Sequence, residues 1–567
     1  MRLYVGLQRV LQRFPIVFAI TSGILLGGAF PQVVGPWAGV LSVCALVPLL
    51  LLIATRAHDV SRTRIVVWLY STFVIYHGLT NWWVCSWQER TDPYLFASGI
   101  ALWLGHPFFL MLPFVALASI RRRLGVAWML VLTPASIAGF EWLHGQTDAS
   151  YPWLTIGYTV VRTPLAQIAD VVGVYGLSFM IALVNAAIAW VVLHRSDRSV
   201  VRQGSIAIAL FMITWFAVGA ARTVGPNPSS TVRALLVQPN EDPWNKWSDP
   251  ELQLSTHLRI SDSARSAISS SRRSIDVVVW SETALPFLIR DQRHREQWNT
   301  LRTWVDTSSV PLITGLADVY VYPRGTAPAS ARRSASDPDL RYDAFNAAMV
   351  LNPSTNRVAL HYKSMLTPFA ERLPFADQLT FAMSWIEWGV GISAWGKGQT
   401  RLPLPVLRGA DTLARIGTII CIESIYPEVA RDMVNNGADL LCVITNDAWY
   451  NGTWGPPQHF DIARMRAIEQ RRALIRCAQS GVTGAILPDG TDAGTLFPVM
   501  QRGALVASVP TQTGRTFYAR VGDPVPILGL LFTIFAIVAA RIPACVRVLS
   551  TRSNRTPRLS TTEKSHL

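Results

Sequence analysis

The sequence predicts a polytopic α-helical membrane domain with eight transmembrane helices, joined to an α/β domain. Two observations predict this fold class. Half of the 567 residues are hydrophobic and only 15% are charged, a composition too apolar for a soluble protein of this length. Long apolar segments recur before residue 224 and once more near the C-terminus, while the stretch between them has the composition of a soluble domain.

Eight apolar segments are long enough to cross a hydrocarbon core of about 30 Å as α-helices. Seven of them precede the soluble stretch and one follows it. They cover residues 15–31, 36–55, 64–84, 95–118, 126–142, 165–193, 205–223 and 523–540. These segments predict a seven-helix membrane domain at 1–224 and an eighth transmembrane helix at 521–541.

The basic residues of the loops predict the orientation of these helices. With eight spans, every basic cluster falls on one side of the membrane, and the positive-inside rule makes that side cytoplasmic. The clusters are Arg2, Arg9 and Arg13, the segments 56–64, 121–123 and 194–202, and the tail after the eighth span. We therefore expect residues 225–520 to form an extracytoplasmic domain and residues 542–567 to form a basic cytoplasmic tail.

A formal net charge of +15 would suit either nucleic acid or an anionic membrane. The sequence has no basic patch interleaved with aromatic residues, which argues against nucleic acid as a partner. The membrane surface is therefore the better explanation of the charge.

Within 225–520, short apolar runs alternate with amphipathic segments, the pattern of a mixed sheet layered with helices. The expected strands are 233–240, 276–282, 311–317, 346–352, 415–422, 439–446 and 484–490, and the expected helices are 251–270, 293–306, 426–436 and 458–475. Residues 324–342, which are basic and rich in Pro, Ala and Ser, predict an exposed insertion. The aromatic segment 373–395 is either a packed helical excursion or a lid that faces lipid, because Trp and Phe favour the membrane interface.

Side chains that could perform chemistry lie at the ends of three apolar runs. Cys421 is near the end of one run, Glu282 ends another, and Lys363 follows a pair of strands. A thiol with an ordinary pKa of about 8.5 is mostly protonated at neutral pH, and it needs a base or a nearby cation to react. A carboxylate can take the thiol proton, and an ammonium group can stabilise the thiolate and the oxyanion of an attacked carbonyl. The three groups together would suit acyl transfer through a thioester.

The soluble stretch contains three cysteines, and an odd number leaves at least one thiol unpaired in an oxidising compartment. Cys442 and Cys477 lie in apolar surroundings, and we interpret both as buried small hydrophobic residues. The sequence leaves a disulfide at Cys421 open.

Three segments stand in the order and context of the Glu–Lys–Cys triad of the nitrilase superfamily: "WSETALPF", "YKSMLTPFAERLPF" and "CIESIYPE". Further matching segments are "VQPNEDPWNKW" and "TNDAWYNGTWGPPQHF" and, in the membrane part, "EWLHG" and "YPWLTIGY". Together with the eight predicted spans, these motifs make the chain resemble the apolipoprotein N-acyltransferase family over nearly its whole length. The chain departs from the family pattern at Ala370, where Gly is usual, and at Ile422, where an aromatic residue is common.

The resemblance implies a nitrilase-like αββα sandwich and a ping-pong acyl transfer. Cys421 would be the nucleophile, Glu282 the general base and Lys363 the cation that stabilises the tetrahedral intermediate. Auxiliary and substrate-binding residues would be Glu371, Glu423, Trp247, Asn446 and Trp449. The acyl donor would be a phospholipid, and the acceptor would be the amino group of diacylglyceryl-cysteine in an apolipoprotein. We expect a monomer without a cofactor, in a bacterial inner membrane with its catalytic domain on the periplasmic side.

Two other classes of protein remain open. A membrane-tethered nitrilase-type amidase would use the same three residues but would transfer the acyl group to water. A transporter with an outer accessory domain would need paired ionisable groups within the spans, where the sequence has few, chiefly Glu141 and Asp170. The sequence has neither a Cys/His metal spacing nor a Gly-rich phosphate loop, so we expect no metal site.

Overall fold

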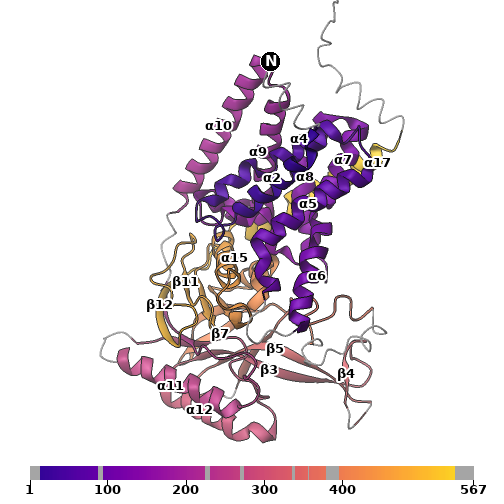
Figure 1. The fold of residues 1–567 in the computed structure, drawn as a ribbon. Helices are drawn as coiled ribbons and strands as arrows, with labels where there is room; N and C mark the ends of the chain where they lie inside the picture. The colour runs from indigo at the N-terminus through magenta and orange to yellow at the C-terminus, as the bar shows by residue number, and fades with distance from the viewer. Residues whose placement is uncertain are drawn as a thin grey trace, which may run out of the picture.

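The computed structural model describes residues 13–86, 93–223, 230–268, 274–334, 337, 339–355, 357–378 and 395–542. Figure 1 shows a bundle of long helices at one end of the molecule and a layered α/β domain at the other. Most of the segment predicted as a lid, residues 379–394, lies outside the described residues, as do residues 543–567 of the predicted tail.

The bundle consists of mostly apolar helices. Its main helices are α2 (Pro15–Gly28), α4 (Val47–Arg56), α5 (Arg62–Asn81), α6 (Pro93–Leu110), α7 (Leu112–Leu124), α8 (Val126–Gly145), α9 (Ala169–Leu193), α10 (Arg198–Ala221) and α17 (Pro524–Ala539). Among the described residues, five helical segments are long and apolar enough to cross a membrane: Ala38–Arg56, Leu95–Leu124, Val126–Gly145, Pro164–Leu193 and Arg198–Ala221. The α2 and α17 helices are apolar but shorter. The chain thus has several apolar helices of the expected kind, and the number eight stays a prediction.

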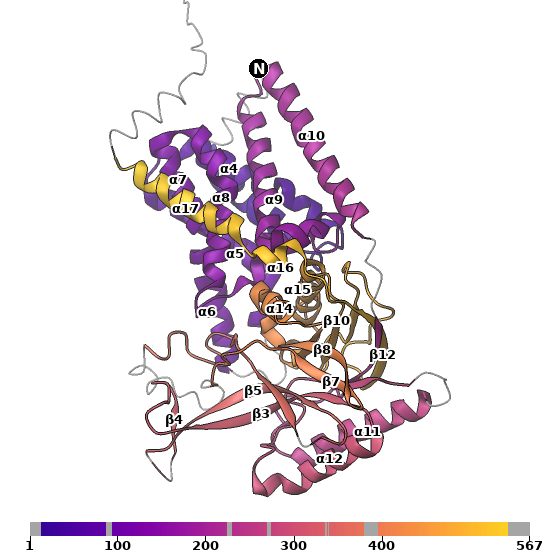
Figure 2. The same cartoon turned by 180° about the vertical axis from the view of Figure 1, so that it is seen from behind.

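The predicted eighth span, α17, joins the bundle although almost the whole α/β domain separates it from the other helices in sequence. Figure 2 shows α17 lying along α8, with which it makes extensive contact. The two backbones approach closely where Gly139 meets Leu530, because a Cβ atom at position 139 would lie 2.6 Å from the Leu530 nitrogen. A glycine is therefore required at this crossing.

A kink in α9 connects the bundle to the α/β domain. Gly173 has a φ of +67°, which interrupts the helix and frees the next backbone N–H group. That group, on Val174, donates to Glu469 Oε1 of the α/β domain at 2.9 Å. Nearby, Asp170 forms an ion pair with Arg471 at 3.0 Å, also across the domain boundary. The ionisable groups at this position therefore fasten the two parts together.

The α/β domain contains two sheets. The larger has the strand order β12-β1-β2-β3-β5-β4 with β6 beside β5, and the smaller has the order β11-β10-β9-β8-β7. The strands are β1 (Ser230–Gln238), β2 (Val277–Trp280), β3 (Leu312–Tyr322), β4 (Arg332–Arg333), β5 (Arg341–Leu351), β6 (Val358–Tyr362), β7 (Leu404–Arg408), β8 (Asp411–Ile420), β9 (Leu440–Thr445), β10 (Leu474–Ala478), β11 (Gly484–Ile486) and β12 (Gly503–Thr511). Neighbouring strands β1 and β2, and likewise β8, β9 and β10, are parallel.

The two sheets pack face to face between two layers of helices. Apolar side chains such as Val279 from the larger sheet and Ile444 from the smaller one share one buried cluster. The outer face of the larger sheet is covered by α11 (Pro250–Ile268) and α12 (Arg295–Ser308). The outer face of the smaller sheet packs on α14 (Pro427–Asn435) and α15 (Gly455–Gln470), and this cluster continues into the bundle. The domain is an αββα sandwich whose second helical layer rests on the apolar helices (Figure 1).

All seven expected strands correspond to strands of the two sheets, but the expected helix at 458–475 is too long. The α15 helix ends at Gln470 because Arg471 takes a left-handed conformation, with a φ of +47°. The apolar residues that follow then form β10 in the middle of the smaller sheet. The sequence pattern also failed to predict β7 and β12, which lie at the edges of the two sheets.

Candidate active site

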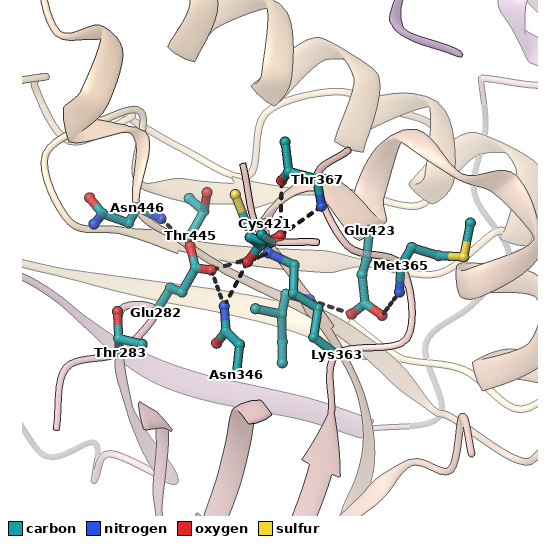
Figure 3. Close-up of polar contacts among 12 residues, drawn as sticks. Glu282, Thr283, Asn346, Lys363, Met365, Thr367, Cys421, Glu423, Thr445 and Asn446 are labelled. Carbon is teal, nitrogen blue, oxygen red and sulfur yellow. Dashed lines mark hydrogen bonds and ion pairs between the residues drawn. The ribbon is translucent and has the colours of Figure 1, made fainter. Parts of the chain in front are cut away.

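The structure brings Glu282, Lys363 and Cys421 together from three strand ends (Figure 3). Glu282 follows β2 and Lys363 follows β6, both in the larger sheet, whereas Cys421 follows β8 in the smaller sheet. Because the inner faces of the sheets pack on each other, these strand ends meet at one edge of the sandwich. The Nζ atom of Lys363 lies 3.3 Å from Glu282 Oε1.

Lys363 is a buried cation between two carboxylates. Its Nζ atom donates to Glu371 Oε1 at 2.8 Å and to Glu282 Oε1 at 3.3 Å, and its side chain is 1% exposed. Burial alone would lower the pKa of Lys363, but the charges of Glu371 and Glu282 outweigh burial and raise it. Burial would also raise the pKa of Glu371, and the Lys363 ammonium reverses this and lowers it. The site therefore holds a permanent positive charge.

Glu282 is fixed by hydrogen bonds on its carboxylate and on its backbone. The Asn446 backbone N–H donates to Glu282 Oε2 at 2.7 Å, and Asn346 Nδ2 donates to Oε1 at the same distance. Lys246 Nζ donates to the Glu282 carbonyl oxygen and to Thr283 Oγ1, both at 2.7 Å. Thr283 has a φ of +45°, a conformation that side chains other than Gly keep only where neighbours hold them. The carboxylate is therefore held in one orientation.

Cys421 is a free thiol at a strained turn. Its φ is +52°, at the junction of β8 and the 3₁₀ turn η7 (Cys421–Ile425). Burial raises the pKa of Cys421, the negative charge of Glu282 raises it further, and the charge of Lys363 opposes both. The resting thiol is therefore protonated. Of the carboxylates around it, Glu282 has the largest effect on the thiol, which makes Glu282 the candidate base.

The other two cysteines of the domain, Cys442 and Cys477, have no exposed surface and lie in the cluster between the sheets. Both are free thiols. The prediction that they are buried small hydrophobic residues is confirmed, and Cys421 has no disulfide partner among the described cysteines.

Glu423 ties the turn that carries the thiol to the segment that carries the lysine. Its Oε2 atom accepts from the Ile420 backbone N–H at 2.8 Å, and its Oε1 atom accepts from the backbone N–H and the hydroxyl of Ser364, both at 2.7 Å. Burial would raise the pKa of Glu423, but His361 and these hydrogen bonds hold it at about 2. Glu423 is thus a buried anion that connects two segments of the site.

The predicted substrate-binding residues take three different positions. Asn446 contacts Glu282 through its backbone N–H, whereas its side-chain oxygen accepts from the Ala448 N–H at 3.3 Å. The side chain of Trp247 is half exposed. The ring of Trp449 packs edge-on against Trp244, with 5.1 Å between the ring centroids. Asn446 is thus hydrogen-bonded to one of the charged groups of the site.

Asn346 and Lys246 belong to the site although the sequence did not predict them. The Asn346 amide donates to Glu282 at 2.7 Å and to Glu371 at 3.3 Å. A polar side chain at the start of the apolar run 346–352 is the signal that could have identified it. Lys246 is 1% exposed, and a lysine beside a tryptophan gives no comparable signal of burial.

The groups that could act on a substrate are a protonated thiol, a carboxylate close to it and a fixed ammonium. This combination suits attack by sulfur on a carbonyl carbon, with the carboxylate as base and the ammonium facing the oxyanion. In the part of the chain that the structure describes, no group of three or more His, Cys, Asp or Glu side chains is arranged to hold a metal ion.

Comparisons with known proteins cover both parts of the chain. The carbon-nitrogen hydrolase family model matches residues 233–518, and the model of the apolipoprotein N-acyltransferase N-terminal domain matches residues 22–187. The apolipoprotein N-acyltransferase of Chlorobaculum tepidum is 32% identical over 94% of this chain and 98% of its own length. That of Geobacter metallireducens is 30% identical over 89% of this chain and 91% of its own. The crystal structure of a carbon-nitrogen hydrolase from Helicobacter pylori G27 covers 52% of this chain and 94% of its own, with a TM-score of 0.35 and 15% identity.

The layered fold and the matched region define the class of the α/β part, which is a carbon-nitrogen hydrolase domain built onto a bundle of apolar helices. Residues 22–187, which form most of the bundle, match the model of the apolipoprotein N-acyltransferase N-terminal domain. The chain belongs to the apolipoprotein N-acyltransferase family.

Proposed function

We propose that this chain transfers a fatty acyl chain from a phospholipid, through a thioester on Cys421, to the amino group of diacylglyceryl-cysteine in an apolipoprotein. One observation carries the mechanism: Lys363 is fixed between Glu282 and Glu371, next to a protonated thiol. Family membership supports the choice of substrates. The contact between the sandwich and the apolar bundle supports a donor taken from the bilayer.

In the first half-reaction, the Glu282 carboxylate takes the Cys421 proton and the sulfur attacks the carbonyl carbon of the phospholipid ester. The oxyanion of the tetrahedral intermediate faces the Lys363 ammonium. The carbon–oxygen bond to glycerol then breaks, and the lysophospholipid leaves with the proton from Glu282. The product of this step is a thioester.

In the second half-reaction, the amino group of the apolipoprotein attacks the thioester carbonyl. Glu282 takes a proton from the amine, and Lys363 again faces the oxyanion. The carbon–sulfur bond breaks and the sulfur recovers its proton, which leaves an amide on the acceptor. One base and one cation thus serve both steps, and ping-pong kinetics follow.

The alternative is a membrane-tethered amidase, which would transfer the acyl group from Cys421 to water and not to an amino group. To decide between them, the protein is incubated with labelled phospholipid, and hydroxylamine-sensitive label on the chain is measured after denaturation. We expect this label to persist in buffer and to move onto a diacylglyceryl lipopeptide when that is added. Equal release of label by buffer alone would favour the amidase.

The proposed topology places eight helices in the membrane, residues 225–520 on the periplasmic side and both termini in the cytoplasm. It rests on the basic clusters described above and not on the number of long helices. We also propose that the chain acts as a monomer.

Labelling of introduced cysteines tests this topology. Thr326 lies in an exposed turn of the α/β domain, and Ser196 lies in the exposed turn between α9 and α10. In intact spheroplasts, a membrane-impermeant maleimide is expected to label Thr326→Cys but to label Ser196→Cys only after lysis. The unaltered chain measures the background from the native thiols. Labelling of both variants before lysis would contradict the eight-span topology.

Glu423→Gln tests whether this buried anion positions the site. A glutamine keeps the shape, but its NH₂ group must face a backbone N–H group that now donates to a carboxylate oxygen. An unsatisfied buried donor costs about 1–3 kcal/mol, so we expect thioester formation to slow by about 10- to 100-fold. Single-turnover acylation measures the rate, and the exposed Glu251→Gln of α11 is the control. A rate equal to that of the unaltered chain would show that the Glu423 charge is dispensable.

A further inference from the structure

We propose that His459 is a positioning residue that holds the carbonyl oxygen of Cys421 and thereby aims the thiol. This inference rests on the proposed function, since it takes Cys421 as the nucleophile. The Nε2 atom of His459 lies 3.0 Å from the Cys421 carbonyl oxygen. A carbonyl oxygen can only accept a hydrogen bond, so we assign the ring proton to Nε2, which also lies 2.8 Å from the Ser424 hydroxyl oxygen.

The carbonyl needs a partner because the backbone at Cys421 is strained. With a φ of +52°, this residue has a conformation that few side chains other than Gly adopt. The backbone of this residue sets the direction of the carbonyl and of the Cα–Cβ bond that carries the thiol. A hydrogen bond that fixes the carbonyl therefore also restricts where the sulfur can lie relative to Glu282 and Lys363. Ser424 Oγ adds a second bond to this carbonyl at 3.0 Å.

The His459 ring is itself held by a buried charged network. Its Nδ1 atom lies 3.0 Å from Arg476 Nη2 and 2.9 Å from Asp447 Oδ1, and Arg476 Nη2 also donates to the other oxygen of that carboxylate at 2.6 Å. Burial and the charge of Arg476 lower the pKa of His459, so the ring is neutral; with its one proton on Nε2, Nδ1 accepts from Arg476. The exposed fractions are 3% for His459, 6% for Asp447 and none for Arg476. Burial would raise the pKa of Asp447, but Arg476 and His459 lower it, so the carboxylate stays ionised. These contacts hold the imidazole ring in one orientation, in which Nε2 faces the carbonyl oxygen of Cys421.

His459 also lies on the helix that docks the sandwich onto the bundle. One residue before it on α15, Gln458 Oε1 accepts from the Trp153 indole at 2.9 Å. Two residues after it, Asp461 accepts from Arg162 Nε at 2.8 Å. The first turns of α15 therefore contact the bundle on one side and the backbone of the nucleophile on the other.

Two conservative substitutions test the roles of the two ring nitrogens separately. His459→Gln places an amide N–H close to the position of Nε2, so it can still donate to the Cys421 carbonyl. His459→Asn places a polar group close to Nδ1, so it keeps the Asp447 side but does not reach the carbonyl. We expect thioester formation to stay within about threefold of normal in the Gln variant and to fall by about 10- to 100-fold in the Asn variant. The KM for phospholipid should change by less than about twofold in both.

The control is His194→Asn, which alters a histidine at the end of α9, in the helical bundle, whose Nδ1 atom lies 2.9 Å from the Trp190 carbonyl oxygen. Its acylation rate should not change. Alkylation of Cys421 by iodoacetamide, measured by peptide mass with Cys421→Ser as the blank, gives a second readout that needs no lipid. It should slow in His459→Asn and not in His459→Gln.

The outcomes separate this inference from the proposed function. If the unaltered chain forms no thioester on Cys421, the proposed function is wrong and the inference falls with it. If the thioester forms normally but the Asn and Gln variants acylate equally fast, only the positioning role is overturned. An equal loss of acylation rate in both variants, with an equal drop in the thermal unfolding temperature, would also overturn the positioning role. That result would show that His459 has a purely structural role.

Discussion

Cys421→Ser is expected to form no acyl-enzyme from phospholipid and to lose transfer by about 10⁴-fold or more, as removal of a nucleophile from a catalytic unit usually does. The hydroxyl keeps the shape of the side chain, but it is a far weaker acid than a thiol. Burial and the charge of Glu282 already raise the pKa of the native thiol, so the same base has no prospect of ionising a serine there. Labelled phospholipid followed by denaturation and mass analysis measures the loss.

Two further variants make this result specific. Cys421→Ala should behave like the serine variant, because both lack a sulfur nucleophile. Cys442→Ala removes a thiol from the core between the sheets. It should keep the normal rate of acyl transfer and lose only thermal stability. A hydroxylamine-sensitive label on Cys421→Ser at the rate of the unaltered chain would mean that another residue is acylated.

The sequence predicted the layered domain well because its central strands are continuous apolar runs. β1, β2 and β9 are buried on both faces, so apolar composition alone marks them. β12 could not be found this way, since it is an edge strand with alternating burial and few long apolar residues. The end of α15 was missed because a left-handed Arg471, and not a glycine, terminates the helix.

Within the site, sequence motifs identified the charged groups but not the distances between them. Glu282, Lys363 and Cys421 follow strands of two different sheets, so only the packing of the sheets brings them together. The roles of Asn346 and His459 depend on contacts across more than 35 residues of sequence, which no local pattern encodes. The state of Cys421 also depends on packing: burial and the charge of Glu282 outweigh the charge of Lys363, and the resting thiol is protonated.

Lys363→Ala is the second variant with a large expected effect. Loss of one donor at a developing oxyanion typically slows a reaction by about 10²- to 10³-fold, and we expect at least that fall in the rate of thioester formation. The contacts of Nζ add a second consequence. Glu282 and Glu371 both lie within 3.3 Å of this atom, so its removal leaves these two carboxylates without the cation between them.

The effect of Lys363→Ala on the neighbouring carboxylates can be measured through the pH dependence of the acylation rate. Lys363 lowers the pKa of Glu371, so the pKa of this carboxyl must rise when the ammonium is removed. Glu371 is then partly protonated at neutral pH, and the charged form of the site is regained only as the pH increases. The residual acylation rate of Lys363→Ala should therefore climb more steeply with pH than that of the unaltered chain. Lys397→Ala removes a half-exposed lysine paired with Asp148 and should change neither the rate nor the pH profile. A Lys363→Ala rate within tenfold of normal, with an unchanged pH profile, would mean that another group stabilises the oxyanion.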